Sequence, residues 1–144
     1  MFDPYLQFDG TCAEALKFYA DTLGGTVQTM TFRDAPEPCG DMPEDVLDRV
    51  MHGSVTVGDR ILMGCDWPTG VWGPYPGLKG VSISVEFPDI AHAQRVYDAL
   101  SAGGKQTMPM GPTFWCESFG MAEDRFGVAW MVSGGKPLGP AAQS

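Results

Sequence analysis

The sequence predicts an α+β fold built from two tandem βαβββ modules that form a curved mixed sheet around a cleft. Three observations lead to this prediction. Strand-like runs of alternating apolar and polar residues flank two amphipathic helical segments, the same order of elements occurs in both halves, and a segment rich in proline and glycine separates the halves. The length of 144 residues is that of a single domain.

The first half begins with a short strand at residues 5–8, which ends at Asp9-Gly10. A helix follows, because Thr11 and Glu14 match a capping box, in which the two side chains satisfy free backbone amides at the start of a helix. One apolar stripe at helical spacing runs along this helix: Cys12, Leu16, Tyr19 and Leu23. Gly24-Gly25 ends it.

Three further strands are predicted in the first half. Residues 27–32 form one strand, and residues 50–57 and 60–65 form a hairpin joined at Gly58-Asp59. Residues 33–48, rich in proline and acidic residues, predict a loop. We divide the chain into module one at 1–66, a linker at 67–79, module two at 80–133 and a flexible tail at 134–144.

The second half begins with an alternating strand at 81–87, in which Ser82, Ser84 and Glu86 form a polar face. Asp89 predicts a helix cap, and Gly103-Gly104 ends the helix. The apolar stripe of this helix consists of Ala93, Val96, Tyr97 and Leu100. Two strands at 113–121 and 127–132, joined by a turn at 123–127, predict the closing hairpin of the sheet.

The two halves are related by an internal repeat. A shift from Thr11 to Asp89 also superposes Tyr19 on Tyr97, Gly25 on Gly103, and residues 28–30 of the strand after the first helix on residues 106–108, so a strand follows the second helix as well. One strand set with a single helix cannot cover both of its faces, so we expect the two modules to pair around a shared interior. Each helix then covers the outer face of its sheet, and the inner faces line a cleft.

The charge of the chain argues against several partners. Nine basic and 18 acidic residues give a net charge of −9, which repels phosphate backbones and anionic lipids. No apolar run is long enough to cross a membrane. We therefore expect no nucleic-acid and no membrane partner.

The cysteines indicate a reducing environment. Cys12, Cys39, Cys65 and Cys116 are widely spaced and form no CxxC pair, although their number alone also allows two disulfides. No signal peptide precedes the first strand. We expect free thiols and a cytoplasmic protein.

Three segments carry a resemblance to a known family: YLQFDG-TCAEALKFY-LGG, VMHGSVTVGDRILMGCD and PTFWCESFG-DRFGVAWMV. Together they resemble the vicinal oxygen chelate superfamily, which includes glyoxalase I, extradiol dioxygenases and the bleomycin and fosfomycin resistance proteins. Within it they look like the PhnB-like branch. The resemblance covers residues 4–133. It implies paired βαβββ modules, a small-molecule ligand and a homodimer.

The resemblance also implies four positions for a divalent metal, which the enzymes of this superfamily bind through His, Glu or Gln. Carried over to this chain within one residue, these positions are Tyr5 or Pro4, Met63, Ser82 and Met131. None of these side chains is an ordinary ligand for a hard or borderline divalent metal. We therefore expect no cofactor and assign no metal ligand.

Three residues are candidates for catalysis. His52 shares a strand face with Ser54 and Thr56, so it can point into the cleft as a base or ligand, or serve as a structural histidine. Glu86 and Glu117 can act as acid or base if an apolar cleft raises their pKa, or they can simply face water.

The residues expected to line the cleft are Tyr5, His52, Ser82, Ser84, Trp115, Glu117 and Met131. Strict alternation along 113–119 would place Phe114 and Cys116 on one face and Trp115 and Glu117 on the other. Trp67 and Trp72 in the linker predict a lid or a contact between subunits.

These observations favour a metal-free, small-molecule binding protein with no established reaction. The alternative is a divalent-metal-dependent lyase, isomerase or dioxygenase that uses shifted ligands around His52 with Glu86 or Glu117. A third possibility is an interaction module whose cleft is filled by its own side chains.

Overall fold

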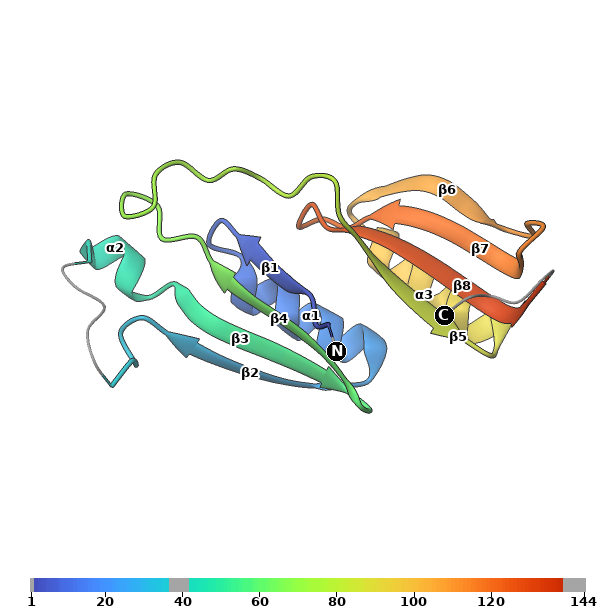
Figure 1. Cartoon of the computed structure of the whole chain (residues 1–144), viewed down its shortest axis with the longest axis horizontal. Coiled ribbons are helices and arrows are strands. Elements are labelled where there is room, and N and C mark those ends of the chain that lie inside the picture. The colour runs from blue at the N-terminus through green and yellow to red at the C-terminus, as the bar shows by residue number, and fades with distance from the viewer. Residues whose placement is uncertain (1, 37–41, 139–144) are drawn as a thin grey trace. The chain divides into compact units, whose positions relative to one another are not determined.

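The computed structural model describes residues 2–36 and 42–138. The chain divides into two compact units, residues 1–79 and 80–144, and each unit combines a four-stranded sheet with a long helix (Figure 1). Each sheet mixes one parallel pair of strands with two antiparallel pairs. The predicted α+β class and the βαβββ order of both modules are confirmed.

The first unit consists of β1 (Tyr5–Phe8), α1 (Cys12–Leu23), β2 (Thr26–Thr31), α2 (Glu44–Leu47), β3 (Val50–Val57) and β4 (Arg60–Asp66). The strand order is β1-β4-β3-β2, with β1 parallel to β4. The prediction of a loop over 33–48 is wrong at α2. The Arg33 guanidinium hydrogen-bonds Glu44 at 2.9 Å and Asp48 at 2.8 Å, and these two acids stand at the two ends of α2.

The second unit consists of β5 (Ser82–Phe87), α3 (Ile90–Ser101), β6 (Lys105–Gly111), β7 (Cys116–Glu123) and β8 (Ala129–Pro137), in the order β5-β8-β7-β6. Strand β7 begins three residues later than predicted, because Thr113 and Cys116 close a turn through backbone and hydroxyl hydrogen bonds. Strand β8 runs on to Pro137, which pairs with Cys116. The segment predicted as a tail therefore begins as strand, and residues 139–144 lie outside the described part.

Helix α1 begins differently from the prediction. The side chain of Thr11 makes no capping hydrogen bond, so the expected capping box with Glu14 is wrong. Instead the buried carboxylate of Asp66, at the end of β4, accepts hydrogen bonds from the backbone amides of Cys12 and Val50, both at 2.9 Å. A distant strand thus supplies the acceptor that a local side chain usually provides. Gly24, with φ of 77°, ends the helix as expected.

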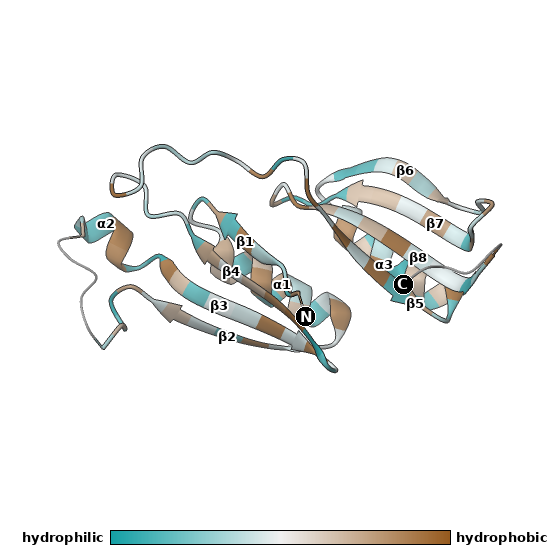
Figure 2. Ribbon diagram, viewed as in Figure 1, coloured by the Kyte–Doolittle hydropathy of each residue, from teal (hydrophilic) through white to brown (hydrophobic). Residues whose placement is uncertain are grey.

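Helix α3 follows its prediction. The Asp89 side chain accepts a hydrogen bond from the Ala91 amide at 3.0 Å, which caps the helix. All four residues of the predicted stripe are buried: Ala93, Val96, Tyr97 and Leu100. Figure 2 shows apolar residues on the strands of each sheet and on the helix packed behind it.

Each helix packs closely on its sheet because a glycine faces it. A Cβ on Gly53 in β3 would lie 2.6 Å from Leu16 Cδ1, and one on Gly120 in β7 would lie 3.0 Å from Tyr97 Cε2. Both distances are too short for a side chain to fit without movement. The buried residues of the first core, including Phe8, Leu16, Tyr19 and Val55, and of the second core, including Tyr97, Trp130 and Val132, lie between helix and sheet.

The turn of the second closing hairpin is organised by a buried carboxylate. Asp124 Oδ1 accepts hydrogen bonds from the amides of Phe126 and Val128 at 2.9 and 3.0 Å, and Asp124 Oδ2 accepts one from the Trp130 indole at 2.8 Å. The side chain of Trp130 is almost fully buried. In the first module the matching turn at Gly58-Asp59 is shorter and exposed.

The predicted linker, residues 67–79, contains no helix or strand. It is anchored on the first unit, because the Tyr75 hydroxyl donates a hydrogen bond to the Gln7 carbonyl of β1 at 2.6 Å. The rings of Trp72 and Tyr75 both contact Trp67 edge to face. Within the described residues, no helix is long and apolar enough to cross a membrane.

Candidate functional site: the open faces of the two sheets

The open face of the first sheet, the side opposite α1, carries a row of uncharged residues. Strand pairing places Tyr5 beside Met63, Met63 beside Ser54, and Ser54 beside Gln28. Directly paired residues point to the same side of a sheet. The alternate residues, such as Leu6 and Val55, are buried against the helix. This first row crosses all four strands of the unit.

The second sheet has an equivalent row. Ser84 pairs with Met131, and Met131 pairs with Met121. The pair Ser84–Met131, like the pair Tyr5–Met63 in the first sheet, joins a module's first strand to its last. Ser82 pairs with Ala129, and this pair lies two residues along each strand from the pair Ser84–Met131. Both Ser82 and Ser84 are exposed, as predicted from the alternation of β5.

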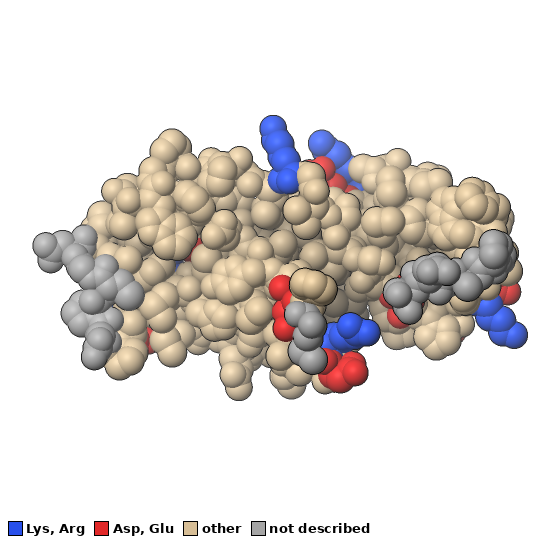
Figure 3. Space-filling model, viewed as in Figure 1, with Lys and Arg blue, Asp and Glu red and all other residues tan. Residues whose placement is uncertain are grey.

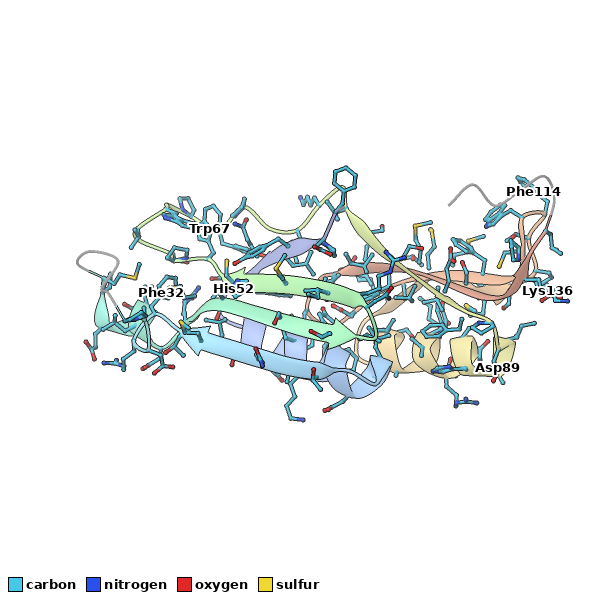
Figure 4. All side chains as sticks on the ribbon, turned by 60° about the horizontal axis from the view of Figure 1, so that its bottom comes forward. Phe32, His52, Trp67, Asp89, Phe114 and Lys136 are labelled. Carbon is cyan, nitrogen blue, oxygen red and sulfur yellow. The ribbon has the colours of Figure 1, made fainter. Side chains whose placement is uncertain are left out.

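Tyr5 and His52 are brought together on the open face of the first sheet. The Tyr5 hydroxyl lies 3.1 Å from His52 Nδ1, and the centres of the two rings are 5.7 Å apart. Figure 4 shows His52 on the sheet, on the side opposite α1. The two residues come from β1 and β3, which are separated by β4. The sequence places both in the cleft but gives no sign of their contact.

Cys65 is a member of this cluster that the sequence did not single out. It is buried in β4 between β1 and β3, and its thiol interacts with the Tyr5 hydroxyl. Partial burial, together with Cys65, raises the pKa of Tyr5 to about 12. Burial also raises the pKa of the Cys65 thiol. Both groups therefore keep their protons at neutral pH.

The Cys12 thiol is not activated either. Burial, with the nearby Asp66 carboxylate, raises the pKa of Cys12 far above its usual range. Cys12, Cys65 and Cys116 are all buried free thiols, in accord with the prediction, and Cys39 lies outside the described residues.

Glu117 stands at a β-bulge near the start of β7. The pairing of β7 with β8 shifts register between Cys116 and Ser118, and the Glu117 carboxylate accepts a hydrogen bond from the Lys136 amide at 2.6 Å. A carboxylate at this position satisfies a backbone group that the bulge leaves without a strand partner. Glu86 is exposed on the open side of β5.

The prediction that Phe114 and Trp115 occupy opposite faces is wrong. Their rings contact each other edge to face, with the ring centres 4.8 Å apart. Both residues precede β7 and therefore do not follow strand alternation. The ring of Trp115 also contacts that of Phe119, with the ring centres 5.3 Å apart, and Trp115 remains 41% exposed. Trp115 thus covers Phe119, which shares the face of Ser133 and Gly111.

Comparison with known proteins identifies the family. A sequence model of the Glyoxalase/Bleomycin resistance protein/Dioxygenase superfamily matches residues 2–132. The chain belongs to this superfamily. Protein YjdN from Escherichia coli (strain K12) is 30% identical over 139 residues, which are 90% of this chain and 92% of that protein.

Solved structures agree with this assignment. Protein PA1353 from Pseudomonas aeruginosa is 46% identical, with a TM-score of 0.83 over 94% of this chain and 97% of that chain. A Bacillus cereus PhnB protein, described as a putative 3-demethylubiquinone-9 3-methyltransferase, is 21% identical, with a TM-score of 0.74 over 92% and 98%. The fosfomycin resistance protein FosX from Mesorhizobium loti shares the fold at 8% identity and a TM-score of 0.61. The expected membership of the superfamily is confirmed.

The residues present do not fit the divalent metal that this superfamily often holds. The positions expected for its ligands are Tyr5, Met63, Ser82 and Met131; strand register pairs Tyr5 with Met63, and pairs Met131 with Ser84 rather than with Ser82. Phenol, thioether and hydroxyl groups are poor ligands for the metals that imidazole and carboxylate bind. Within the described residues, no group of three or more His, Cys, Asp or Glu side chains is placed to hold an ion.

Proposed function

We propose that this superfamily member binds a small, uncharged organic molecule on the open face of the first sheet, without a divalent metal. The observation that supports this most strongly is the Tyr5–His52 pair, which presents two polar groups beside the uncharged row of the same face. Met30 in β2 and Ile61 in β4 add exposed apolar surface to the same sheet. An uncharged surface with a few polar groups is typical of a small-molecule site.

The distribution of charge is consistent with an uncharged ligand. Figure 3 shows mostly uncharged side chains on the face in view. Five ion pairs are formed by the described residues of the first unit, and none of them includes a residue of the first row: Lys17–Asp21, Arg33–Glu44, Arg33–Asp48, Arg49–Asp9 and Arg60–Asp59. With a net charge of −9, an anionic ligand would meet long-range repulsion.

Thermal melts with a library of neutral, cationic and anionic small molecules test this proposal. A compound that binds only the folded protein at a hundred times its Kd adds about 2.7 kcal/mol of stability. We expect neutral compounds to raise the melting temperature, and His52→Ala to reduce the shift. The control is His92→Ala, because His92 is exposed on α3 against Phe87. A library without a single neutral binder, or equal shifts in both variants, would contradict the proposal.

We further propose that the protein acts in the cytoplasm as a homodimer. The exposed aromatic side chains of Trp72 and Phe114 support a contact with a second chain, because large exposed rings are enriched at such interfaces. Light scattering after size-exclusion chromatography measures the mass directly. A monomer at micromolar concentration would rule out the dimer.

A further inference from the structure

We propose that Tyr5 holds His52 in the tautomer with its proton on Nε2, so that this N–H is available to an acceptor oxygen of the bound molecule. Tyr5 is then a positioning residue that acts through His52. The part of this proposal that concerns the bound molecule rests on the proposed function. The tautomer of His52 can be measured without any ligand.

The direction of the hydrogen bond follows from the groups around the phenol. The Tyr5 hydroxyl has one proton to donate, and its polar neighbours are His52 Nδ1 at 3.1 Å and the Cys65 thiol. An imidazole nitrogen is a much better acceptor than sulfur, which accepts only weakly. The two acceptors therefore compete for the one phenolic proton, and the imidazole nitrogen is the stronger of them.

This arrangement fixes the imidazole. If Nδ1 accepts a hydrogen bond, a neutral ring carries its proton on Nε2. The raised pKa of Tyr5, about 12, keeps the phenol protonated and able to donate throughout the neutral range. His52 itself is exposed, so its second nitrogen has access to a molecule on the open face.

The surroundings select the chemical class of the acceptor. The strand partner of His52 is Met30, and that of Cys65 is Gln7, so the neighbours of the pair carry no charge. A neutral imidazole N–H donor among methionine and amide side chains matches a neutral acceptor, of which the carbonyl oxygen of a ketone, aldehyde or amide is the simplest. A carboxylate or phosphate would lack a cationic partner here.

The tautomer is tested by nuclear magnetic resonance of the uniformly ¹⁵N-labelled full chain. Long-range ¹H–¹⁵N correlations are recorded about two pH units above the ordinary histidine pKa of about 6.5, where the ring is neutral. We expect His52 to show a protonated Nε2 and a hydrogen-bonded Nδ1, with His92 as internal reference. Tyr5→Phe should shift the Nδ1 resonance, whereas Tyr75→Phe, which removes another hydroxyl bonded to β1, should not. A protonated Nδ1 in the wild type, or no change in Tyr5→Phe, overturns the inference.

The ligand class is tested on the same sample with acetophenone and cumene, which have similar shape but differ in the carbonyl oxygen. We expect acetophenone to shift the His52 Nε2–H resonance and to bind about three- to tenfold more tightly than cumene, the effect of one neutral hydrogen bond. Equal effects of the two probes, or none, overturn the acceptor assignment even if the tautomer is as expected. Failure of the broader proposal is distinct, because it would appear as no neutral binder at all in the melts.

Discussion

The carboxylate of Asp66 and the backbone amide of Cys12 lie 2.9 Å apart, which joins the last residue of β4 to the first residue of α1. The second carboxylate oxygen accepts the amide of Val50 at the start of β3. One buried side chain therefore ties together the helix and two strands of the first unit. Its removal leaves two backbone amides without their acceptor.

We predict that Asp66→Ala lowers the free energy of unfolding by about 2–4 kcal/mol, because two hydrogen bonds to a buried charged group are lost. Thr11→Ala should cost about 0.5 kcal/mol or less, since its side chain makes no capping bond. Urea unfolding of both variants gives the comparison. A larger loss of stability in Thr11→Ala than in Asp66→Ala would indicate that Thr11 does cap the helix, and would contradict the structure.

In the second unit, Trp130→Phe should destabilise the protein by about 1–3 kcal/mol, because the buried Asp124 carboxylate loses its indole donor. Trp72→Phe is the matched control, since Trp72 is 56% exposed. We expect the control to change stability by about 0.5 kcal/mol or less. Equal effects of the two substitutions in thermal or urea unfolding would argue against this role of Asp124.

Glu117 is predicted to act on the β-bulge. Glu117→Ala should accelerate hydrogen exchange of the Lys136 amide by about two- to tenfold, because that amide loses its acceptor. Glu117→Gln retains an acceptor oxygen and should exchange more slowly than the alanine variant. Unchanged exchange in Glu117→Ala would show that the carboxylate does not hold the bulge.

The raised pKa of Tyr5 predicts a pH dependence at the alkaline end. The folded protein holds this phenolic proton up to about pH 12, whereas a tyrosine with the ordinary pKa of 10.0 loses it earlier. The corresponding stabilisation is complete below pH 10 and is lost as pH rises through about 12. An ultraviolet titration of tyrosinate should show one fewer late-titrating group in Tyr5→Phe than in the wild type. If Tyr5→Phe instead lacks a tyrosine that titrates near pH 10, the raised pKa of Tyr5 is contradicted.

Elements with strong local signals were predictable from the sequence. Alternation in β5, the stripes of α1 and α3, the glycine that ends α1 and the Asp89 cap depend on residues close in sequence, so their pattern determines their structure. The repeat identified the two modules for the same reason. The short helix α2 was missed because Arg33, which binds its two ends, lies outside it.

The candidate site was only partly predictable, because its contacts cross strands. The sequence placed Tyr5 and His52 on an inner face, but their hydrogen bond depends on the register of β1, β4 and β3, which no local pattern contains. Cys65 lies two residues after Met63, so the alternation of the strand already indicates that it shares the face of Met63. The roles of Asp66 and Glu117 depend on partners 54 and 19 residues away.

We expect this member of the superfamily to bind its ligand without a divalent metal. The metal content of untagged protein purified without chelator, followed by thermal melts with Zn²⁺, Ni²⁺, Mn²⁺ and Fe²⁺, tests this expectation. We predict much less than one equivalent of metal and no rise in melting temperature, because Tyr5, Met63, Ser82 and Met131 offer no suitable ligand set. One equivalent of bound metal, with the stabilisation of about 2.7 kcal/mol expected at a hundred times Kd, would contradict this expectation.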